Sequence, residues 1–184
     1  MALPNDIFAN FRIRKLGLND SVTQFDCGDE DLNDFIINDA PLYRKALLAT
    51  TFILENNVTG QTIAYFSVAN DRISIQDFPS NTDFNRFRKH KFVNDKRLKS
   101  YPAIKICRLG IDKSAQGLQI GTFLIDFIGT LFVTDNKSGC RFLTVDAYYK
   151  AIPFYLKNDF AFLSTDDENQ RTRLMFFDLA DISE

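Results

Sequence analysis

The chain has 184 residues, a hydrophobic fraction of 45% and a formal net charge of −2. That length allows one domain with a full hydrophobic core and leaves little room for a second, so we expect residues 1–184 to form a single domain. The slightly acidic pI of about 5.5 argues against a surface dominated by binding to nucleic-acid phosphates, although a local basic patch stays open.

Alternating apolar patterns in the first half of the chain predict three strands. We expect these at Phe11–Leu16, Thr50–Leu54 and Thr62–Ala69. The turn-rich segment Glu55–Gly60 joins the last two, which predicts a hairpin.

A helix is expected between the first two strands. Apolar residues recur at helical spacing over Asp29–Ala40, after a capping segment at Asp26–Gly28, and Pro41 is expected to interrupt the helix. The later segment Asp77–Ser100 is less regular. It carries seven basic residues, Arg86, Arg88, Lys89, Lys91, Lys96, Arg97 and Lys99.

The second half of the chain predicts two further helices between strands. The segment Tyr101–Ile111 alternates as a half-buried strand does, and apolar residues from Phe123 to Phe132 then recur at helical spacing. A turn at Asn136–Gly139 and a strand at Arg141–Ala147 follow. A short helix at Ala151–Lys157 completes this part.

Two strands, Phe160–Leu163 and Leu174–Leu179, close the chain on either side of a polar run. The order of elements predicts a mixed α/β (α+β) fold with a central sheet of six to seven strands and helices on both faces. We expect antiparallel pairs in the first half of the sheet and a parallel pair flanking the long helix.

The segment Gln116–Gly121 joins the predicted central strand to the long helix. The first N–H groups of a helix have no acceptor within the helix, and the helix dipole places partial positive charge there. A diphosphate satisfies both features, and glycine lets the backbone approach it closely. Because many α/β domains contain such a junction without a ligand, the junction alone leaves ligand binding open.

Metal and nucleophile patterns are absent from the sequence. The three cysteines, Cys27, Cys107 and Cys140, lie far apart, and with the single histidine His90 they give no zinc-ligand spacing. We therefore expect no metal and a reducing compartment. His90 is expected to be a solvated surface residue. No secretory leader and no stretch of about 18 apolar residues occurs, so we expect a cytoplasmic protein outside the membrane.

Two motifs resemble the GNAT superfamily of N-acetyltransferases. The family pattern Gln/Arg-x-x-Gly-x-Gly/Ala is matched by Gln116 and Gly121, with Gln119 in place of the middle glycine. The segment Ala151–Phe160 resembles the family's Ala-x-x-Phe-Tyr-x-x-x-Gly-Phe, with Asp159 in place of the glycine. The resemblance implies a single-domain GNAT-like fold and acetyl-CoA as cosubstrate.

The resemblance also implies roles for individual residues. A primary amine would attack the thioester directly in a ternary complex, and Tyr155 would be the catalytic general acid that protonates the CoA thiolate. Backbone groups of Leu109, Gly110 and Ile111 would meet the pantetheine arm. The diphosphate would be bound by backbone groups of Gln116, Gly117, Leu118, Gln119, Ile120, Gly121 and Thr122.

The acceptor amine is left open by these motifs. The segment Phe25–Gly28, followed by Leu32 and Phe35, resembles the opening of a bacterial branch that includes toxins of toxin–antitoxin pairs. An aminoacyl-tRNA acceptor and an antitoxin partner are therefore alternatives, with the acidic pI counting against tRNA. A non-catalytic module that binds CoA or a protein is a further alternative. A homodimer is among the assemblies that the resemblance allows.

Overall fold

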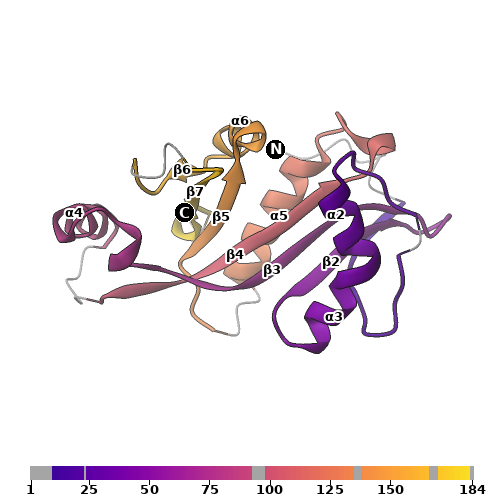
Figure 1. The fold of residues 1–184 in the computed structure, drawn as a ribbon, viewed down its shortest axis with the longest axis horizontal. Helices are drawn as coiled ribbons and strands as arrows, with labels where there is room; N and C mark the ends of the chain where they lie inside the picture. Colours follow the sequence, from indigo (N-terminus) through magenta and orange to yellow (C-terminus); the bar gives the residue numbers. More distant parts are fainter. Residues whose placement is uncertain (1–9, 23, 93–97, 135–137, 166–169, 183–184) are drawn as a thin grey trace. The chain divides into compact units, whose positions relative to one another are not determined.

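The computed structural model describes residues 10–22, 24–92, 98–134, 138–165 and 170–182 (Figure 1). The chain divides into two compact units. The first unit contains Met1–Ala69 and Ile106–Leu124, and the second contains Asn70–Lys105 and Ile125–Glu184.

The strands form one seven-stranded mixed sheet in the order β1-β2-β3-β4-β5-β7-β6. They are β1 (Phe11–Lys15), β2 (Thr50–Asn56), β3 (Thr62–Ser74), β4 (Ser100–Ile111), β5 (Phe142–Tyr148), β6 (Ala161–Phe162) and β7 (Thr172–Asp178). β2 pairs antiparallel with β1 and β3, β4 pairs parallel with β5, and β7 pairs antiparallel with β5 and β6. The predicted mixed sheet, its antiparallel first half and its parallel pair are confirmed.

β3 continues well beyond the predicted end at Ala69. The polar residues Asn70 and Asp71 break the apolar alternation that the prediction followed, but Asp71 accepts a hydrogen bond from the Thr144 hydroxyl on β5. Ile73 is then buried again. A polar residue whose hydrogen bond is satisfied can therefore lie within a strand.

The helical segment after β1 extends further than predicted. It comprises α2 (Glu30–Asp34), a π-helical turn (Phe35–Asp39) and α3 (Ala40–Lys45). The prediction that Pro41 interrupts the helix is wrong. Pro41 lies in the first turn of α3, where a missing backbone N–H costs no hydrogen bond and the fixed φ suits a helix.

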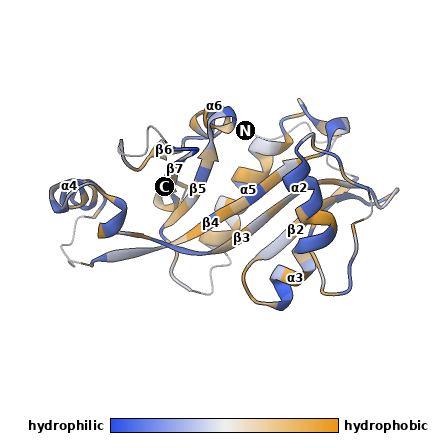
Figure 2. Cartoon of the chain, viewed as in Figure 1, coloured by the Kyte–Doolittle hydropathy of each residue, from blue (hydrophilic) through white to orange (hydrophobic). Residues whose placement is uncertain are grey.

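The segment predicted to be irregular contains a helix, α4 (Asn81–Lys91). The Ser80 hydroxyl caps this helix by accepting a hydrogen bond from the Asp83 N–H at 3.1 Å. The periodicity was hidden because charged residues outnumber apolar ones, and Figure 2 shows α4 largely in the hydrophilic colour. Phe84 is its buried residue.

The remaining predicted elements are confirmed with small shifts of their ends. They are α5 (Ile120–Thr134), α6 (Ile152–Lys157) and the strands β5 to β7. Lys96 and Arg97 of the basic segment lie outside the described residues. The predicted turn at Asn136–Gly139 lies partly outside them. No helix in the described part of the chain combines the length and apolar character needed to cross a bilayer.

Each unit has its own hydrophobic core. The first-unit core gathers the buried residues Leu16, Val22, Phe25, Phe35, Ile36, Ala40, Ile53 and Tyr65. The second-unit core gathers Ile73, Phe84, Tyr101, Ala103, Phe142, Leu163 and Phe176. Phe142 and Phe176 of the second core pack edge to face with their ring centroids 5.9 Å apart, so phenylalanine serves packing there.

Candidate functional site

The loop between β4 and α5 is fixed where it leaves the sheet. The Asp112 backbone N–H donates to the Ile63 carbonyl of β3 at 2.9 Å. Its carboxylate accepts hydrogen bonds from the Ser114 N–H at 3.0 Å and the Ser114 hydroxyl at 2.6 Å. These bonds form the 3-10 turn Lys113–Ala115, so the path of the backbone toward α5 is set before the loop begins.

Two residues of the loop have left-handed backbone conformations. φ is +82° at Gly117 and +60° at Gln119. A Cβ added to Gly117 would meet no atom within 4 Å, so glycine serves the backbone angle there and not the packing. The middle glycine of the family pattern is thus replaced by an exposed glutamine that keeps a glycine-like φ, which typically costs about 1–2 kcal/mol.

The loop delivers unpaired backbone donors to the start of a long helix. α5 has 15 residues, and the Phe123 N–H bonds to the Gln119 carbonyl at 3.1 Å. The N–H groups of Ile120, Gly121 and Thr122 precede that bond and have no acceptor within the helix. Together with the helix dipole, this arrangement can bind an anion such as a diphosphate.

The side chain of Gln116 has a structural role. Its amide nitrogen donates to the Cys27 carbonyl at 2.9 Å and to the Ile111 carbonyl at 3.0 Å. One amide group therefore joins the end of β4 to a segment that precedes α2. The backbone of Gln116 remains a candidate for the ligand.

The three residues predicted to meet the pantetheine arm are the last three of β4. The parallel ladder between β4 and β5 ends at Lys105, so Leu109–Ile111 lie beyond it. Gly110 has no space for a side chain, because a Cβ there would lie 2.8 Å from the Tyr65 ring and 3.2 Å from Phe25. Packing against these rings explains the glycine.

The predicted general acid, Tyr155, lies on α6 in the second unit. Its ring packs edge to face on the rings of Phe154 and Phe160, with centroid distances of 5.1 Å and 5.2 Å. Only 6% of the residue is exposed. Burial raises the pKa of Tyr155 above its usual value, so the phenol stays protonated at neutral pH. A protonated phenol can donate to a departing thiolate.

A Schellman motif that includes the Tyr155 carbonyl ends α6. The Phe160 N–H donates to the Tyr155 carbonyl at 3.1 Å, and the Asp159 N–H donates to the Leu156 carbonyl at 3.2 Å. Asp159 has φ of +63°, the conformation for which the family uses glycine. Aspartate tolerates this conformation better than most residues, so the motif survives the replacement.

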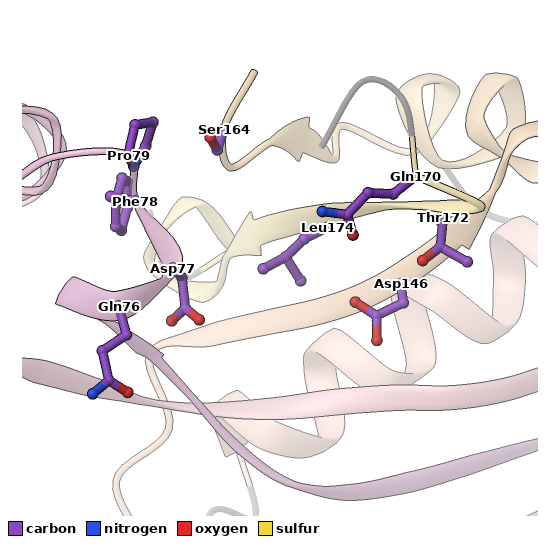
Figure 3. Close-up of a pocket in the computed structure, with 9 residues that line it drawn as sticks. All are labelled: Gln76, Asp77, Phe78, Pro79, Asp146, Ser164, Gln170, Thr172 and Leu174. Atoms are coloured by element: carbon purple, nitrogen blue, oxygen red, sulfur yellow. The ribbon is translucent and has the colours of Figure 1, made fainter. Parts of the chain in front are cut away.

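The second unit also contains a cavity of about 310 Å³ that the sequence did not predict. Figure 3 shows the carboxyl groups of Asp77 and Asp146 on either side of Leu174. Asp77 accepts hydrogen bonds from the backbone and hydroxyl of Ser74, and Asp146 pairs with Lys105. The residues that line the cavity are Gln76, Asp77, Phe78, Pro79, Asp146, Ser164, Gln170, Thr172 and Leu174.

Other chemically capable residues are engaged or solvated. His90 is exposed on α4, as expected. Lys91 of the basic segment pairs with the buried Asp178 at 3.0 Å, whereas Lys89 is exposed. Burial raises the pKa of Cys140 to about 11, so its thiol is a poor nucleophile. Among the described residues, no group of three or more His, Cys, Asp or Glu is arranged to hold a metal ion.

The predicted site residues thus fall into two groups. The residues predicted to bind the cosubstrate all lie in the first unit, where β4, the loop and the start of α5 bring them together. Tyr155 lies in the second unit.

Similar structures identify the fold. A Tyr-to-Phe mutant of KacT matches with a TM-score of 0.74 and 21% identity, over 95% of this chain and 98% of that one. AtaT complexed with acetyl-methionyl-tRNAfMet matches with a TM-score of 0.71 and 23% identity, over 94% and 97%. The protein has the GNAT fold. AtaTR bound with AcCoA shares it, with a TM-score of 0.71 and 21% identity over 95% and 96%.

The chain also resembles a known protein in sequence. The tRNA-acetylating toxin of Mycobacterium tuberculosis (strain ATCC 25618 / H37Rv) is 25% identical over 155 residues, which are 83% of this chain and 86% of that protein. No family model matches the sequence. The resemblance inferred from the motifs is confirmed at the level of the fold.

Proposed function

We propose that the protein is an acetyl-CoA-dependent N-acetyltransferase that modifies the α-amino group of aminoacyl-tRNA. The observation that carries this proposal is the match to a tRNA-acetylating toxin over 83% of the chain. The complex of AtaT with acetyl-methionyl-tRNAfMet supports it, because that protein has the same fold. Aminoacyl-tRNA, which the acidic pI counted against, is thus the acceptor that we prefer.

In this proposal, acetyl-CoA binds to the first unit. Backbone N–H groups of Gln116–Thr122 hold the diphosphate, and the pantetheine arm extends along Leu109–Ile111. The left-handed residues Gly117 and Gln119 support this assignment, because left-handed backbone of this kind recurs in concave anion-binding turns. The structure of AtaTR bound with AcCoA shows that the fold accommodates this cosubstrate.

The proposed chemistry is a direct transfer. The neutral amine nitrogen attacks the thioester carbonyl carbon, a C–N bond forms and the C–S bond breaks. Tyr155 donates its proton to the departing sulfur, and the proton lost by the amine passes to solvent, from which Tyr155 is reprotonated. The buried, protonated phenol supports this role.

An α-amino acceptor also lessens the need for a general base. An α-amino group has a pKa of about 7.7–8.0, whereas a lysine side chain has a pKa of about 10.4. At neutral pH a substantial fraction of α-amino groups is therefore already neutral and nucleophilic. The exposed basic residues of α4, Arg86 and Lys89, are the candidates for contacting tRNA phosphates despite the acidic net charge.

The test uses purified protein, labelled acetyl-CoA and a set of aminoacyl-tRNAs, with uncharged tRNA as the control. We expect label to enter aminoacyl-tRNA and free CoA to form in equal amounts. If the label entered only free amines, the acceptor would be a free amine and not aminoacyl-tRNA. Acetyl-CoA binding without CoA release across tRNAs and amines would favour the non-catalytic module and overturn the proposal. Growth arrest on expression, relieved by a neighbouring small antitoxin, would connect the activity to a toxin.

A further inference from the structure

The segment Phe25–Gly28 lies apart from the chemistry proposed above, yet it is firmly anchored. Phe25 is buried and packs edge to face on the Tyr65 ring at 5.3 Å. The Tyr65 hydroxyl in turn donates to the Leu32 carbonyl of α2 at 2.7 Å. One end of the segment is therefore held in the first-unit core.

The other end of the segment is hydrogen-bonded to the loop that precedes α5. The Asp26 N–H donates to the Asp112 carboxylate at 3.0 Å, and the Lys113 N–H donates to the Asp26 carbonyl at 2.8 Å. The Lys113 ammonium contacts the Asp26 carboxylate at 2.7 Å. With the bond from Gln116 to the Cys27 carbonyl, four contacts join segments that lie more than eighty residues apart.

Internal bonds give the segment its shape. The second oxygen of Asp26 accepts hydrogen bonds from the Gly28 N–H at 2.8 Å and the Asn33 amide at 3.1 Å. Gly28 has φ of +85°, so the backbone angle favours glycine there, and a Cβ would lie 3.2 Å from the flexible Lys113 side chain. Bonding to Lys113, Gly28 and Asn33 lowers the pKa of Asp26 to about 2, so its carboxylate is charged at neutral pH.

We infer that Asp26 and Gln116 are positioning residues for acetyl-CoA, because the contacts of Asp26–Gly28 with Asp112, Lys113 and Gln116, here called the Asp26 clasp, hold the diphosphate loop in its binding conformation. The inference rests on the proposed function and adds to it Asp26 and the side chain of Gln116. The loop that follows the clasp has two left-handed residues, one of them a disfavoured glutamine, so it needs external support to keep its shape. The clasp is that support.

The clasp acts by restricting the conformations of the loop more than by the electrostatic attraction between Asp26 and Lys113. The Asp26 and Lys113 side chains are 55% and 59% exposed, and an exposed ion pair contributes little by itself. Loss of the clasp would let the loop sample other conformations, and acetyl-CoA binding would then have to order it again. If the binding conformation falls to a tenth to a third of the population, the Kd rises by roughly 3–10-fold.

The test compares two clasp variants with a matched control in α2. Asp26→Asn replaces one of the two acceptor oxygens that bond Lys113, Gly28 and Asn33 with an amide NH2 group, and Gln116→Glu replaces a donor with an acceptor that faces two carbonyl oxygens. Asp31→Asn makes the same charge change at an exposed residue outside the clasp. We expect both clasp variants to raise the acetyl-CoA Kd by roughly 3–10-fold in calorimetry, and we expect Asp26→Asn to keep kcat at saturating acetyl-CoA within about twofold of the parent. The control should match the parent.

Hydrogen exchange separates this inference from the proposed function. The amides of residues 112–119 should exchange faster in both clasp variants and at the parental rate in Asp31→Asn, whether or not acetyl-CoA binds. Unchanged exchange and unchanged Kd would overturn the clasp while leaving the acetyltransferase intact. Faster exchange in the clasp variants, combined with no binding of acetyl-CoA by the parent protein, would instead support the clasp and count against the proposed function. A kcat loss without a Kd change would also overturn the positioning role.

Discussion

Replacing Gln119 by glycine is expected to stabilise the protein. The glutamine has φ of +60°, which costs an L-residue about 1–2 kcal/mol, and its exposed side chain offers little packing in return. Glycine removes this strain but adds about 0.5–1 kcal/mol of backbone entropy to the unfolded chain. The difference predicts about 0.5–1 kcal/mol of added stability, or a Tm higher by about 1–4 °C for a chain of this size.

Gln61→Gly provides the matched control. Gln61 is also exposed, but it lies outside the left-handed region, so glycine there should only add unfolded-state entropy and lower the Tm by about 1–4 °C. Thermal unfolding followed by circular dichroism would measure both variants. The acetyl-CoA Kd of Gln119→Gly should fall by up to about fivefold if the loop conformation is the binding one. A Tm that falls equally in both variants would refute the reasoning.

Further predictions concern turnover, the second-unit core and tRNA. Tyr155→Phe should lower kcat roughly 100-fold to 10,000-fold in a CoA-release assay at unchanged acetyl-CoA Kd, and parental turnover would remove Tyr155 from the mechanism. Because burial raises the pKa of Tyr155, the parental rate should rise as the amine deprotonates near pH 8 and show no fall up to pH 9. Asp178→Asn removes the buried carboxylate that pairs with the half-buried Lys91 and Arg141 and should cost about 1.5–3 kcal/mol in urea unfolding, and a loss below about 0.5 kcal/mol would contradict this. Lys89→Glu on α4 should weaken aminoacyl-tRNA binding more than Lys45→Glu on α3, and equal effects in filter binding would exclude α4 from the interface.

The sequence was a reliable guide where one periodic pattern dominated. The alternation of β4 and the helical spacing of α5 predicted both elements and the loop between them. α4 was missed because its charged residues mask the spacing of Phe84, and the capping pattern of Ser80 and Asp83 was the available sign. Pro41 misled because a proline that breaks a helix and one that begins a helix look the same without the tertiary fold.

The candidate site was predictable only in its backbone. Glycines and a helix start mark the diphosphate loop, whereas the left-handed φ of Gln119 leaves no trace in a glutamine. The Asp26 clasp and the cavity beside Asp146 join residues far apart in the chain, and no local pattern encodes such contacts. Their identification required the fold.

The close packing at Gly110 has a consequence for how relatives of this chain should vary. A methyl group at this position would lie 2.8 Å from the Tyr65 ring, and Phe25 would be displaced with it. Residues 65 and 110 should therefore covary, with alanine at 110 appearing only where a smaller side chain replaces the tyrosine. Through Phe25, that constraint on the core extends to the loop proposed to bind acetyl-CoA. Sequence changes in this part of the core and sequence changes in the loop would therefore limit one another.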